Sequence, residues 1–345
     1  MSTNQQSKTI FLAPAPRTVH EIFDENDLVR LRAVAELVIE EQAPVTEAVF
    51  EEKAAKAEII IGQIDLPESR LKKASSLKAV FNVEGNFLPN IDYDYCFRNG
   101  IRVLSISPVF AEPVAEAALG MAIDLARGIS RSDRNFRQGT EEYGLPANRE
   151  AFSLYRADVG LVGLGDLGKA ILPLLQPFAC RIRAHDPWLP AEYIQSLGCE
   201  AASLEDLFRL SRLVFIVASV TSQNQGFLGK QQFASMQRGS GVVLLSRAGV
   251  VDFDAMLDFA NRKQIRFATD VFPEEPLPPA HPARVSANSI LCAHQAGAMP
   301  DVLRRIGKLV VADTELLAKG LPPILCKIAH PETVALFRSK PVSKS

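Results

Sequence analysis

Short apolar runs alternate with amphipathic stretches between residues 8 and 107. From residue 23 to residue 40, apolar side chains recur at the spacing of one helical face (Leu28, Leu31, Val34, Ala35, Val38), which predicts a helix. Strands that alternate with helices are typical of βαβ units and a parallel sheet. The predicted strands of this first series are residues 8–13, 58–62, 77–83 and 101–106.

The same alternation begins again after a long predicted helix at residues 112–127. A polar segment rich in Gly and Arg, residues 128–156, follows this helix. The last predicted helix, residues 300–319, ends at a Gly-Leu-Pro-Pro sequence that stops helices. Two α/β units joined near residues 108–113 are the simplest interpretation. The second series of predicted strands comprises residues 158–163, 181–186, 213–218, 242–245, 265–271 and 289–293.

Composition narrows the class of protein. The length of 345 residues corresponds to about two typical domains. Lys and Arg number 38 against 40 Asp and Glu, and this balance disfavours nucleic acid or an anionic membrane as the main partner. No apolar run approaches the roughly 18 residues of a membrane span, and the N-terminus is polar where a signal peptide is apolar. Five scattered cysteines disfavour disulfides and a metal site, so we expect a cytoplasmic protein.

One glycine motif follows a predicted strand and precedes a predicted helix. Gly163, Gly165 and Gly168 form the pattern G-x-G-x-x-G, and Asp186 ends the next predicted strand. In a dinucleotide-binding turn the first glycine permits the tight turn, the second lets the backbone approach the pyrophosphate, and the third lets the helix lie close to the strand. An acidic residue about 20 positions later binds the ribose hydroxyls. The alternative is a tight strand-to-helix turn that binds no ligand.

Three further predicted strands end in side chains that can carry chemistry. Ser246 and Arg247 follow one, Asp270 and Glu275 follow the next, and His294 follows the last. In an open parallel sheet, ligands bind beyond the carboxyl ends of the strands, so we expect these groups to converge. Arg offers a planar set of donors that matches a carboxylate, and His can give or take a proton near neutral pH.

The order of these motifs resembles the D-2-hydroxyacid dehydrogenase family over residues 58–320. The resemblance rests on Val114-Ala115-Glu116, the glycine turn, Arg247, the Asp270-Val271-Phe272 and Glu275-Pro276 segments, and His294. It implies an NAD-dependent oxidoreductase that interconverts a D-2-hydroxy acid and a 2-oxo acid. In this family Arg247 would bind the substrate carboxylate or carbonyl, His294 would be the acid and base, and Glu275 would be its partner.

The resemblance also implies which residues bind each ligand. Substrate would contact Gly85, Asn86, Phe87, Arg247 and His294. The family further implies a homodimer, formed through the helix at 112–127 and the segment after it. The NAD-binding set would be Gly163, Gly165, Asp166, Leu167, Gly168, Asp186, Ser246, Arg247, Asp270, His294 and Gly297.

The expected fold is α/β, with two doubly wound parallel-sheet domains. Residues 1–110 and 300–345 would form a flavodoxin-like substrate domain, and residues 111–299 a Rossmann NAD-binding domain. Asp186 favours NAD over NADP because a 2′-phosphate would meet its negative charge. Arg181 and Arg183 share one face of the predicted strand and Asp186 lies on the other, so we do not expect them to bind that phosphate.

The chain departs from the family pattern at several positions. Leu244 stands where the family often has Asn, and Ser219 and Asn224 occupy a loop that usually carries Pro and Thr. Phe87 replaces the second glycine of the substrate loop, so we expect its ring to shape the substrate pocket; the alternative is that it belongs to the core. Two other functions remain open: an NAD-sensing, corepressor-like binding protein, and a formate dehydrogenase-like enzyme, which Glu275 disfavours because that group pairs its His with Gln.

Overall fold

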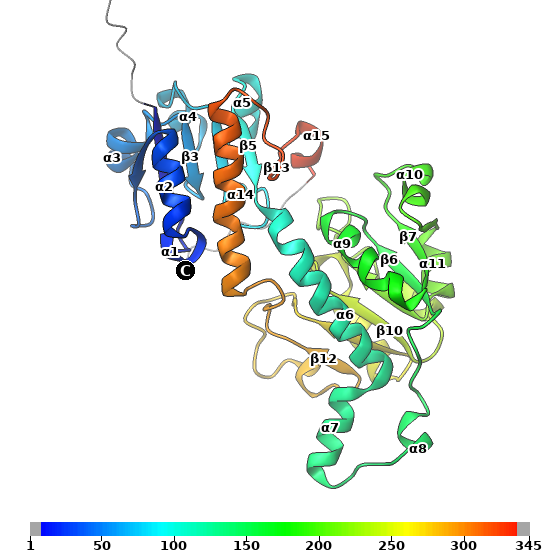
Figure 1. Ribbon diagram of the computed structural model, residues 1–345. Coiled ribbons are helices and arrows are strands. Elements are labelled where there is room, and N and C mark those ends of the chain that lie inside the picture. The colour runs from blue at the N-terminus through cyan, green and yellow to red at the C-terminus, as the bar shows by residue number, and fades with distance from the viewer. Residues whose placement is uncertain (1–7, 337–345) are drawn as a thin grey trace, which may run out of the picture. The chain divides into compact units, whose positions relative to one another are not determined.

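The computed structural model describes residues 8–336 and divides into two compact units (Figure 1). One unit runs through Phe110 and resumes at Ala298, and the other is Ala111–Gly297. Residues 1–7 and 337–345, which the sequence assigns to the substrate domain, lie outside the described residues. No helix within residues 8–336 is both long and apolar enough to cross a membrane.

The described part of the first unit contains one six-stranded sheet in the order β13-β5-β4-β3-β1-β2. Strands β1 to β5 are parallel, and β13 runs antiparallel to β5. The parallel order 2-1-3-4-5 is that of the flavodoxin-like fold, as predicted. The elements are β1 (Thr9–Ala13), α1 (Val19–Ile22), α2 (Glu25–Val34), β2 (Glu36–Ile39), α3 (Glu47–Val49), β3 (Ile59–Gly62), α4 (Glu68–Lys73), β4 (Ala79–Asn82), α5 (Tyr93–Arg98), β5 (Arg102–Ser105), α14 (Pro300–Ala318), β13 (Lys327–Ile328) and α15 (Pro331–Val334).

The predicted helix at residues 23–40 is wrong in its second half. Helix α2 begins after Asp24, whose carboxylate accepts a hydrogen bond from the Asp27 N–H at 2.8 Å, and it ends at Val34. Residues 36–39 then form β2, which pairs with β1. The apolar spacing fits a helix, but β-branched Val38 and Ile39 complete the edge of the sheet. Strands β8 and β13, of two residues each, were also not predicted.

The second unit, all of which is described, contains a seven-stranded sheet in the order β12-β11-β10-β9-β6-β7-β8. The strands are parallel, and the chain reverses its winding between β6 and β9, which is the Rossmann arrangement. Its elements are α6 (Ala111–Arg127), α7 (Ile129–Gln138), α8 (Leu145–Asn148), β6 (Asp158–Val162), α9 (Asp166–Leu175), β7 (Arg181–His185), α10 (Ala191–Ser196), β8 (Glu200–Ala201), α11 (Leu204–Leu210), β9 (Leu213–Ile216), α12 (Lys230–Ser235), β10 (Ser240–Leu244), α13 (Phe253–Asn261), β11 (Ile265–Thr269) and β12 (Ser289–Leu291).

Helices cover both faces of the second sheet. Helix α6, predicted at residues 112–127, buries a stripe of small residues (Ala115, Ala118, Ala122 and Ala126) and contacts α9 and β10. Small side chains allow such close contact between helices and sheet. Beyond α6, residues 128–150 form an arm that contains α7 and α8 and extends away from the sheet (Figure 1). The chain then returns to the core at Phe152 and Leu154.

Candidate active site

The glycine turn joins β6 to α9 at the point where the sheet reverses its winding. Gly163 has a φ of +94°, and a Cβ added there would lie 2.7 Å from the backbone of Ala218. A Cβ on Gly168 would lie 2.4 Å from the Gly163 carbonyl oxygen. Only glycine fits these two positions without a shift of the backbone.

Gly165 differs from the other two glycines because nothing lies within 4 Å of where its Cβ would be. It is the N-cap of α9 and has no side chain to cap the helix. The first-turn N–H groups of a helix lack intrahelical partners, and the N-terminus favours negative charge. The open space above Gly165 therefore suits a pyrophosphate, whereas Asp166 and Leu167 continue into α9, where Leu167 contacts the core.

Asp186 lies directly after β7 and is tied to the glycine turn. Its Oδ2 accepts a hydrogen bond from the Leu164 N–H at 2.8 Å, and its Oδ1 accepts one from the Trp188 N–H at 3.0 Å. Each carboxylate oxygen can accept a further hydrogen bond. Asp186 is therefore oriented by the backbone and retains acceptor capacity for a hydroxyl-bearing ligand.

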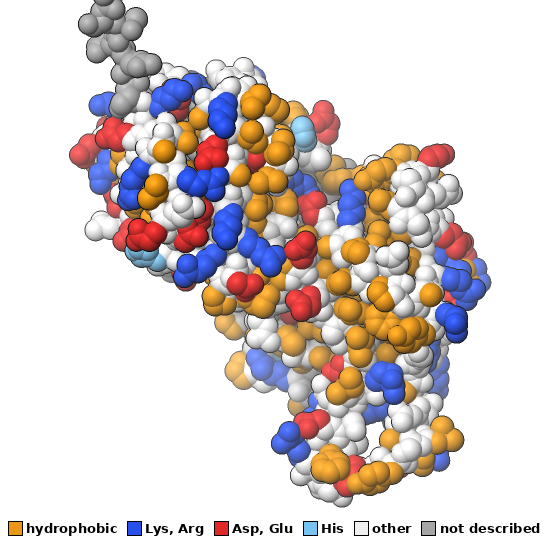
Figure 2. All heavy atoms as spheres, viewed as in Figure 1, with side chains coloured by type: hydrophobic (Ala, Val, Ile, Leu, Met, Phe, Trp, Pro, Cys, Tyr) orange, Lys and Arg blue, Asp and Glu red, His pale blue; other side chains and the backbone are white. Residues whose placement is uncertain are grey.

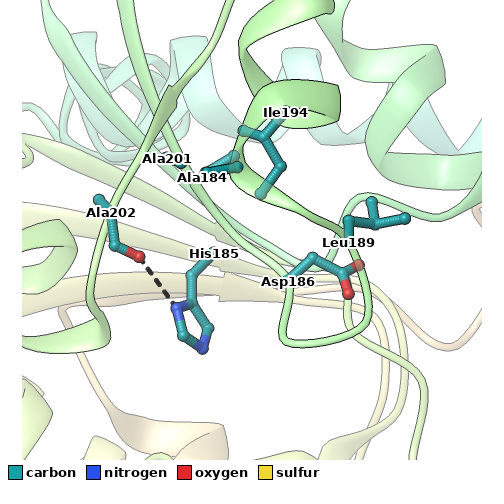
Figure 3. A pocket seen from close by; sticks show the side chains of 8 residues that line it. Ala184, His185, Asp186, Leu189, Ile194, Ala201 and Ala202 are labelled. Carbon is teal, nitrogen blue, oxygen red and sulfur yellow. Dashed lines mark hydrogen bonds between the residues drawn. The ribbon is translucent and has the colours of Figure 1, made fainter.

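A hollow of about 240 Å³ opens beside Asp186 (Figure 3). His185 lines it, and its Nδ1 lies 3.0 Å from the Ala202 carbonyl oxygen. The sequence offered no reason to assign His185 a function, although its position next to Asp186 at a strand end is a usable signal. The remaining lining residues are mostly apolar: Ala184, Leu189, Ala191, Ile194 and Ala201.

Arg181 and Arg183 are engaged away from Asp186. Arg181 Nη2 lies 2.5 Å from Asp158 Oδ2, and Arg183 Nη1 lies 2.9 Å from Asp158 Oδ1. Arg183 Nε also lies 3.2 Å from Glu200 Oε2. Both guanidinium groups are thus neutralised by carboxylates on neighbouring strands.

Arg247 follows β10 at the carboxyl edge of the sheet. The residue is exposed, and its Nη1 donates a hydrogen bond to the Ser246 carbonyl at 2.7 Å. Ser246 itself is buried, and its hydroxyl has no hydrogen-bond partner among the described residues. A buried hydroxyl without a partner is unusual in a folded protein, and it suits a polar ligand group.

Asp270 follows β11, the strand next to β10. It is buried, and burial raises the pKa of its carboxyl group. Its Oδ2 accepts a hydrogen bond from the Ala296 N–H at 3.1 Å, and its carbonyl accepts one from the His294 N–H at 2.8 Å. These two hydrogen bonds hold the segment that carries His294. The same segment continues to Gly297, the last residue of the unit.

His294 and Glu275 form a direct contact. The His294 Nδ1 lies 2.6 Å from Glu275 Oε2, and the other carboxylate oxygen accepts a hydrogen bond from the Phe272 N–H at 2.9 Å. His294 has a φ of +48°, a left-handed conformation that is uncommon outside glycine and occurs at functional sites. The contact directs Nδ1 to the carboxylate and leaves Nε2 for another partner.

The predicted substrate loop lies in the first unit, after β4. The Asn86 N–H donates to the Glu84 carbonyl at 2.9 Å, so the loop turns tightly through Gly85. The Phe87 ring is only 5% exposed and meets Tyr93 edge-on at 6.3 Å. The burial of the ring favours the alternative that Phe87 belongs to the core of its unit; a role in shaping the substrate pocket stays a prediction.

Two other departures from the family pattern have structural explanations. Leu244 is fully buried at the end of β10. Asn224 closes its loop, because its Oδ1 accepts a hydrogen bond from the Thr221 N–H at 2.7 Å and its Nδ2 donates to the Ser219 carbonyl at 2.8 Å. Within the described residues, no group of three His, Cys, Asp or Glu side chains is placed to hold a metal ion.

Comparison with known proteins supplies the family. Residues 119–296, more than half of the chain, match the family described as D-isomer specific 2-hydroxyacid dehydrogenase, NAD binding domain. The chain belongs to this family. NAD is accordingly the cofactor of the second unit, and the open glycine turn with its adjacent Asp186 fits it.

Similar proteins that match most of the chain, and not only its NAD-binding domain, support this family. A solved phosphoglycerate oxidoreductase from Rhizobium etli is 41% identical with a TM-score of 0.85, and the match covers 94% of this chain and 98% of that one. A glyoxylate reductase of Korarchaeum cryptofilum is 27% identical over 83% of this chain and 87% of its own length. A D-3-phosphoglycerate dehydrogenase of Methanocaldococcus jannaschii is 25% identical over 78% of this chain, which spans only 51% of that relative.

Proposed function

We propose that the chain is an NAD-dependent oxidoreductase that interconverts a D-2-hydroxy acid and a 2-oxo acid. The observation that carries the proposal is the 2.6 Å contact between His294 and Glu275 at the carboxyl edge of an NAD-binding sheet. Arg247 and Asp270 follow the two adjacent strands. An acid and base, a cation and a cofactor domain are the groups that this reaction requires.

The second unit would hold NAD through its own backbone and a few side chains. The first turn of α9 would face the pyrophosphate, with Gly165 allowing close approach. Asp186 would accept hydrogen bonds from the adenosine ribose, and the hollow beside His185 would receive part of the adenosine. The Ser246 hydroxyl would supply a hydrogen bond to a polar group of the cofactor. When bound, NADH would supply the hydride in reduction and NAD⁺ would accept it in oxidation.

His294 would move the proton. With its Nδ1–H held by Glu275, the ring presents Nε2 toward the substrate oxygen. In reduction, the imidazolium donates its Nε2 proton to the carbonyl oxygen, which becomes the hydroxyl of the product. In oxidation, neutral Nε2 accepts the hydroxyl proton. Glu275 stabilises the imidazolium form and keeps the ring oriented.

Arg247 would bind and polarise the substrate. Its guanidinium group can donate two parallel hydrogen bonds to a carboxylate, or one to a carbonyl oxygen on which negative charge develops. A role for the first unit in substrate binding rests on the family resemblance of residues 85–87, whose backbone amides are the groups suited to a carboxylate.

Initial-rate measurement of NADH oxidation tests this function. Purified protein is assayed with glyoxylate, hydroxypyruvate, 3-phosphohydroxypyruvate and pyruvate, each with NADH, and the product of the best substrate is resolved on a chiral column. We expect turnover of at least one 2-oxo acid with a D-configured product. Tight NADH binding without turnover of any of them would instead identify an NAD-sensing protein.

We also propose that the chain forms a homodimer through α6 and the arm. The arm carries large apolar side chains that are exposed in a single chain, namely Ile129, Phe136, Tyr143 and Leu145, and Figure 2 shows apolar side chains on it. Exposed apolar clusters of this kind mark interaction surfaces. Light scattering should give twice the mass of one chain, and Phe136→Asp should give the single mass.

A reducing cytoplasm is the proposed location, which fits five unpaired cysteines.

A further inference from the structure

A second group of cations lies at the base of the arm, apart from the cofactor site. Arg131 and Arg134 on α7 and Arg266 on β11 line one small hollow, together with Asp124 and the start of α7. Figure 2 shows Lys and Arg side chains in this region, where the end of α6 meets the arm. Three arginines around one hollow are costly unless negative charge compensates them.

Arg266 is the most constrained member of the group. It is only 7% exposed, and its Nη2 donates to the carbonyls of Glu150 and Gly239 at 3.0 and 2.8 Å. Its Nε is buried with no hydrogen-bond partner among the described residues. Carbonyl groups satisfy donors but do not neutralise the charge, so the buried guanidinium group lacks an anion.

A fourth cation adds to this charge. Arg212 and Arg266 both stack on the Phe152 ring, at 4.6 and 5.6 Å from its centroid. Neither arginine forms an ion pair with a carboxylate in residues 8–336. Burial lowers the pKa of Arg266, the positive charges of Arg212 and Arg131 lower it further, and the negative charge of Glu150 opposes them.

The nearby carboxylates do not cancel the excess. Both oxygens of Asp124 accept hydrogen bonds from Ser130, one from its N–H at 2.8 Å and one from its hydroxyl. Glu150 reaches Arg131 only at 3.9 Å and is largely exposed. The three arginines that line the hollow therefore outnumber Asp124, the carboxylate that lines it with them, and Glu150 lies near only one of the three.

We propose that this hollow binds a small tetrahedral oxyanion such as inorganic phosphate or sulfate. Its volume of about 30 Å³ corresponds to roughly two water molecules, which is the size of one small ion. Arg131 and Arg134 supply charge-assisted hydrogen bonds, and the buried Arg266 supplies charge that the fold does not otherwise compensate.

The oxyanion site is separate from the cofactor site. Arg266 is the second residue of β11, at the amino end of the sheet, whereas Asp270 follows the carboxyl end of the same strand. Four residues of extended strand correspond to about 13 Å. An oxyanion bound here would join α6 and α7 to β11 and stabilise the second unit without entering the catalytic centre.

Thermal unfolding and calorimetry test this site with inorganic phosphate as the probe. The full chain, saturated with NADH to occupy the cofactor site, is melted in about 10 mM phosphate and in KCl of equal ionic strength. We expect phosphate to raise Tm by about 2–4 °C. Arg131→Ala and Arg134→Ala should each weaken phosphate binding about tenfold or more. Arg209→Ala, an exposed arginine elsewhere in the unit, should leave phosphate affinity unchanged.

Three outcomes would overturn the site. The first is no phosphate-specific shift in Tm and no heat of binding. The second is an equal phosphate effect in the Arg131→Ala/Arg134→Ala double variant, which would place the ion elsewhere. The third is a loss of the dimer in these variants with no phosphate effect, which would mean that a carboxylate of a second copy fills the hollow. Both substituted arginines lie on α7 outside the core, so folding of the variants is verified by a cooperative transition in KCl with Tm at or above the wild-type value.

Discussion

The Asp186 carboxylate is hydrogen-bonded to the glycine turn between β6 and α9, which is the proposed site of the cofactor pyrophosphate. The Leu164 N–H, between the first two glycines of the motif, donates to Asp186 Oδ2 at 2.8 Å. The acidic residue and the glycine turn come from different strands, β7 and β6, and this bond sets their relative position. In the proposed function, one hydrogen bond therefore joins the residue that would bind the ribose to the turn that would bind the pyrophosphate.

Asp186 should determine the choice between NADH and NADPH. We expect wild-type kcat/KM to favour NADH by at least tenfold, a difference that needs only about 1.4 kcal/mol. Asp186→Ser should narrow that preference because it removes the charge that repels a 2′-phosphate. Arg181→Ala should leave the preference unchanged, since Arg181 is paired with Asp158. A wild-type preference for NADPH would contradict the assignment.

Substitution by alanine should have different effects on Tm and on NADH affinity at different glycines of the turn. Gly165→Ala should keep the wild-type Tm, because space is open around the new methyl group, but should weaken NADH binding about tenfold or more as the methyl group meets the pyrophosphate. Gly163→Ala should lower Tm, since its Cβ would lie 2.7 Å from the Ala218 backbone. Gly120→Ala, in α6 with open space, is the control for NADH affinity alone, because alanine within a helix is expected to raise Tm. Fluorescence titration of NADH that gave equal affinities for Gly165→Ala and wild type would exclude this turn as the phosphate site.

Most of the architecture follows from periodicity. Buried strands such as β1 are apolar throughout, and α6 has a clear apolar stripe, so both were predictable. The error at residues 36–39 arose because Val34, Ala35 and Val38 fit a helical spacing and a strand equally well. Residues 36–39 form a strand because they pair with β1. That pairing joins residues far apart in the sequence, so local spacing does not reveal it.

The sequence predicts site residues that have reactive side chains at strand ends. It predicts less well the residues whose position depends on tertiary packing. His294, Glu275 and Asp186 stand at strand ends, and the structure places the first two in contact. Phe87 stands in a predicted loop, but it is buried against the core of the first unit, where Tyr93 on α5 is one of its contacts. His185 has no motif, so only the hollow that it lines draws attention to it.

Phe87 should affect stability more than substrate choice. Because the ring is buried in the first unit, Phe87→Ala should lower the free energy of unfolding by about 3–5 kcal/mol. Phe87→Leu, which keeps much of the volume, should cost less. Urea denaturation measures both, and relative kcat/KM values across small and bulky 2-oxo acids should stay unchanged in Phe87→Leu. A broadened substrate range at wild-type stability would restore a pocket-lining role.

Asp270 should make stability depend on pH in a defined direction. Burial raises the pKa of its carboxyl group, so the folded chain holds this proton more tightly than the unfolded chain does. Ionisation of Asp270 therefore destabilises the fold as pH rises through the folded-state value, and the cost is absent below the unfolded value. Asp270→Asn keeps an acceptor for the Ala296 N–H and removes the charge. Its Tm should exceed the wild-type Tm at neutral pH, and the difference should close as pH falls; a gap that is constant with pH would contradict this origin.

The most direct test of the proposed mechanism is the kcat of His294→Ala on the best 2-oxo acid with saturating NADH. If His294 moves the proton, kcat should fall by about 100-fold or more in a variant that still folds and is still saturated by NADH. A kcat within about threefold of wild type in this folded, NADH-binding variant would contradict the assignment of His294 as the acid and base.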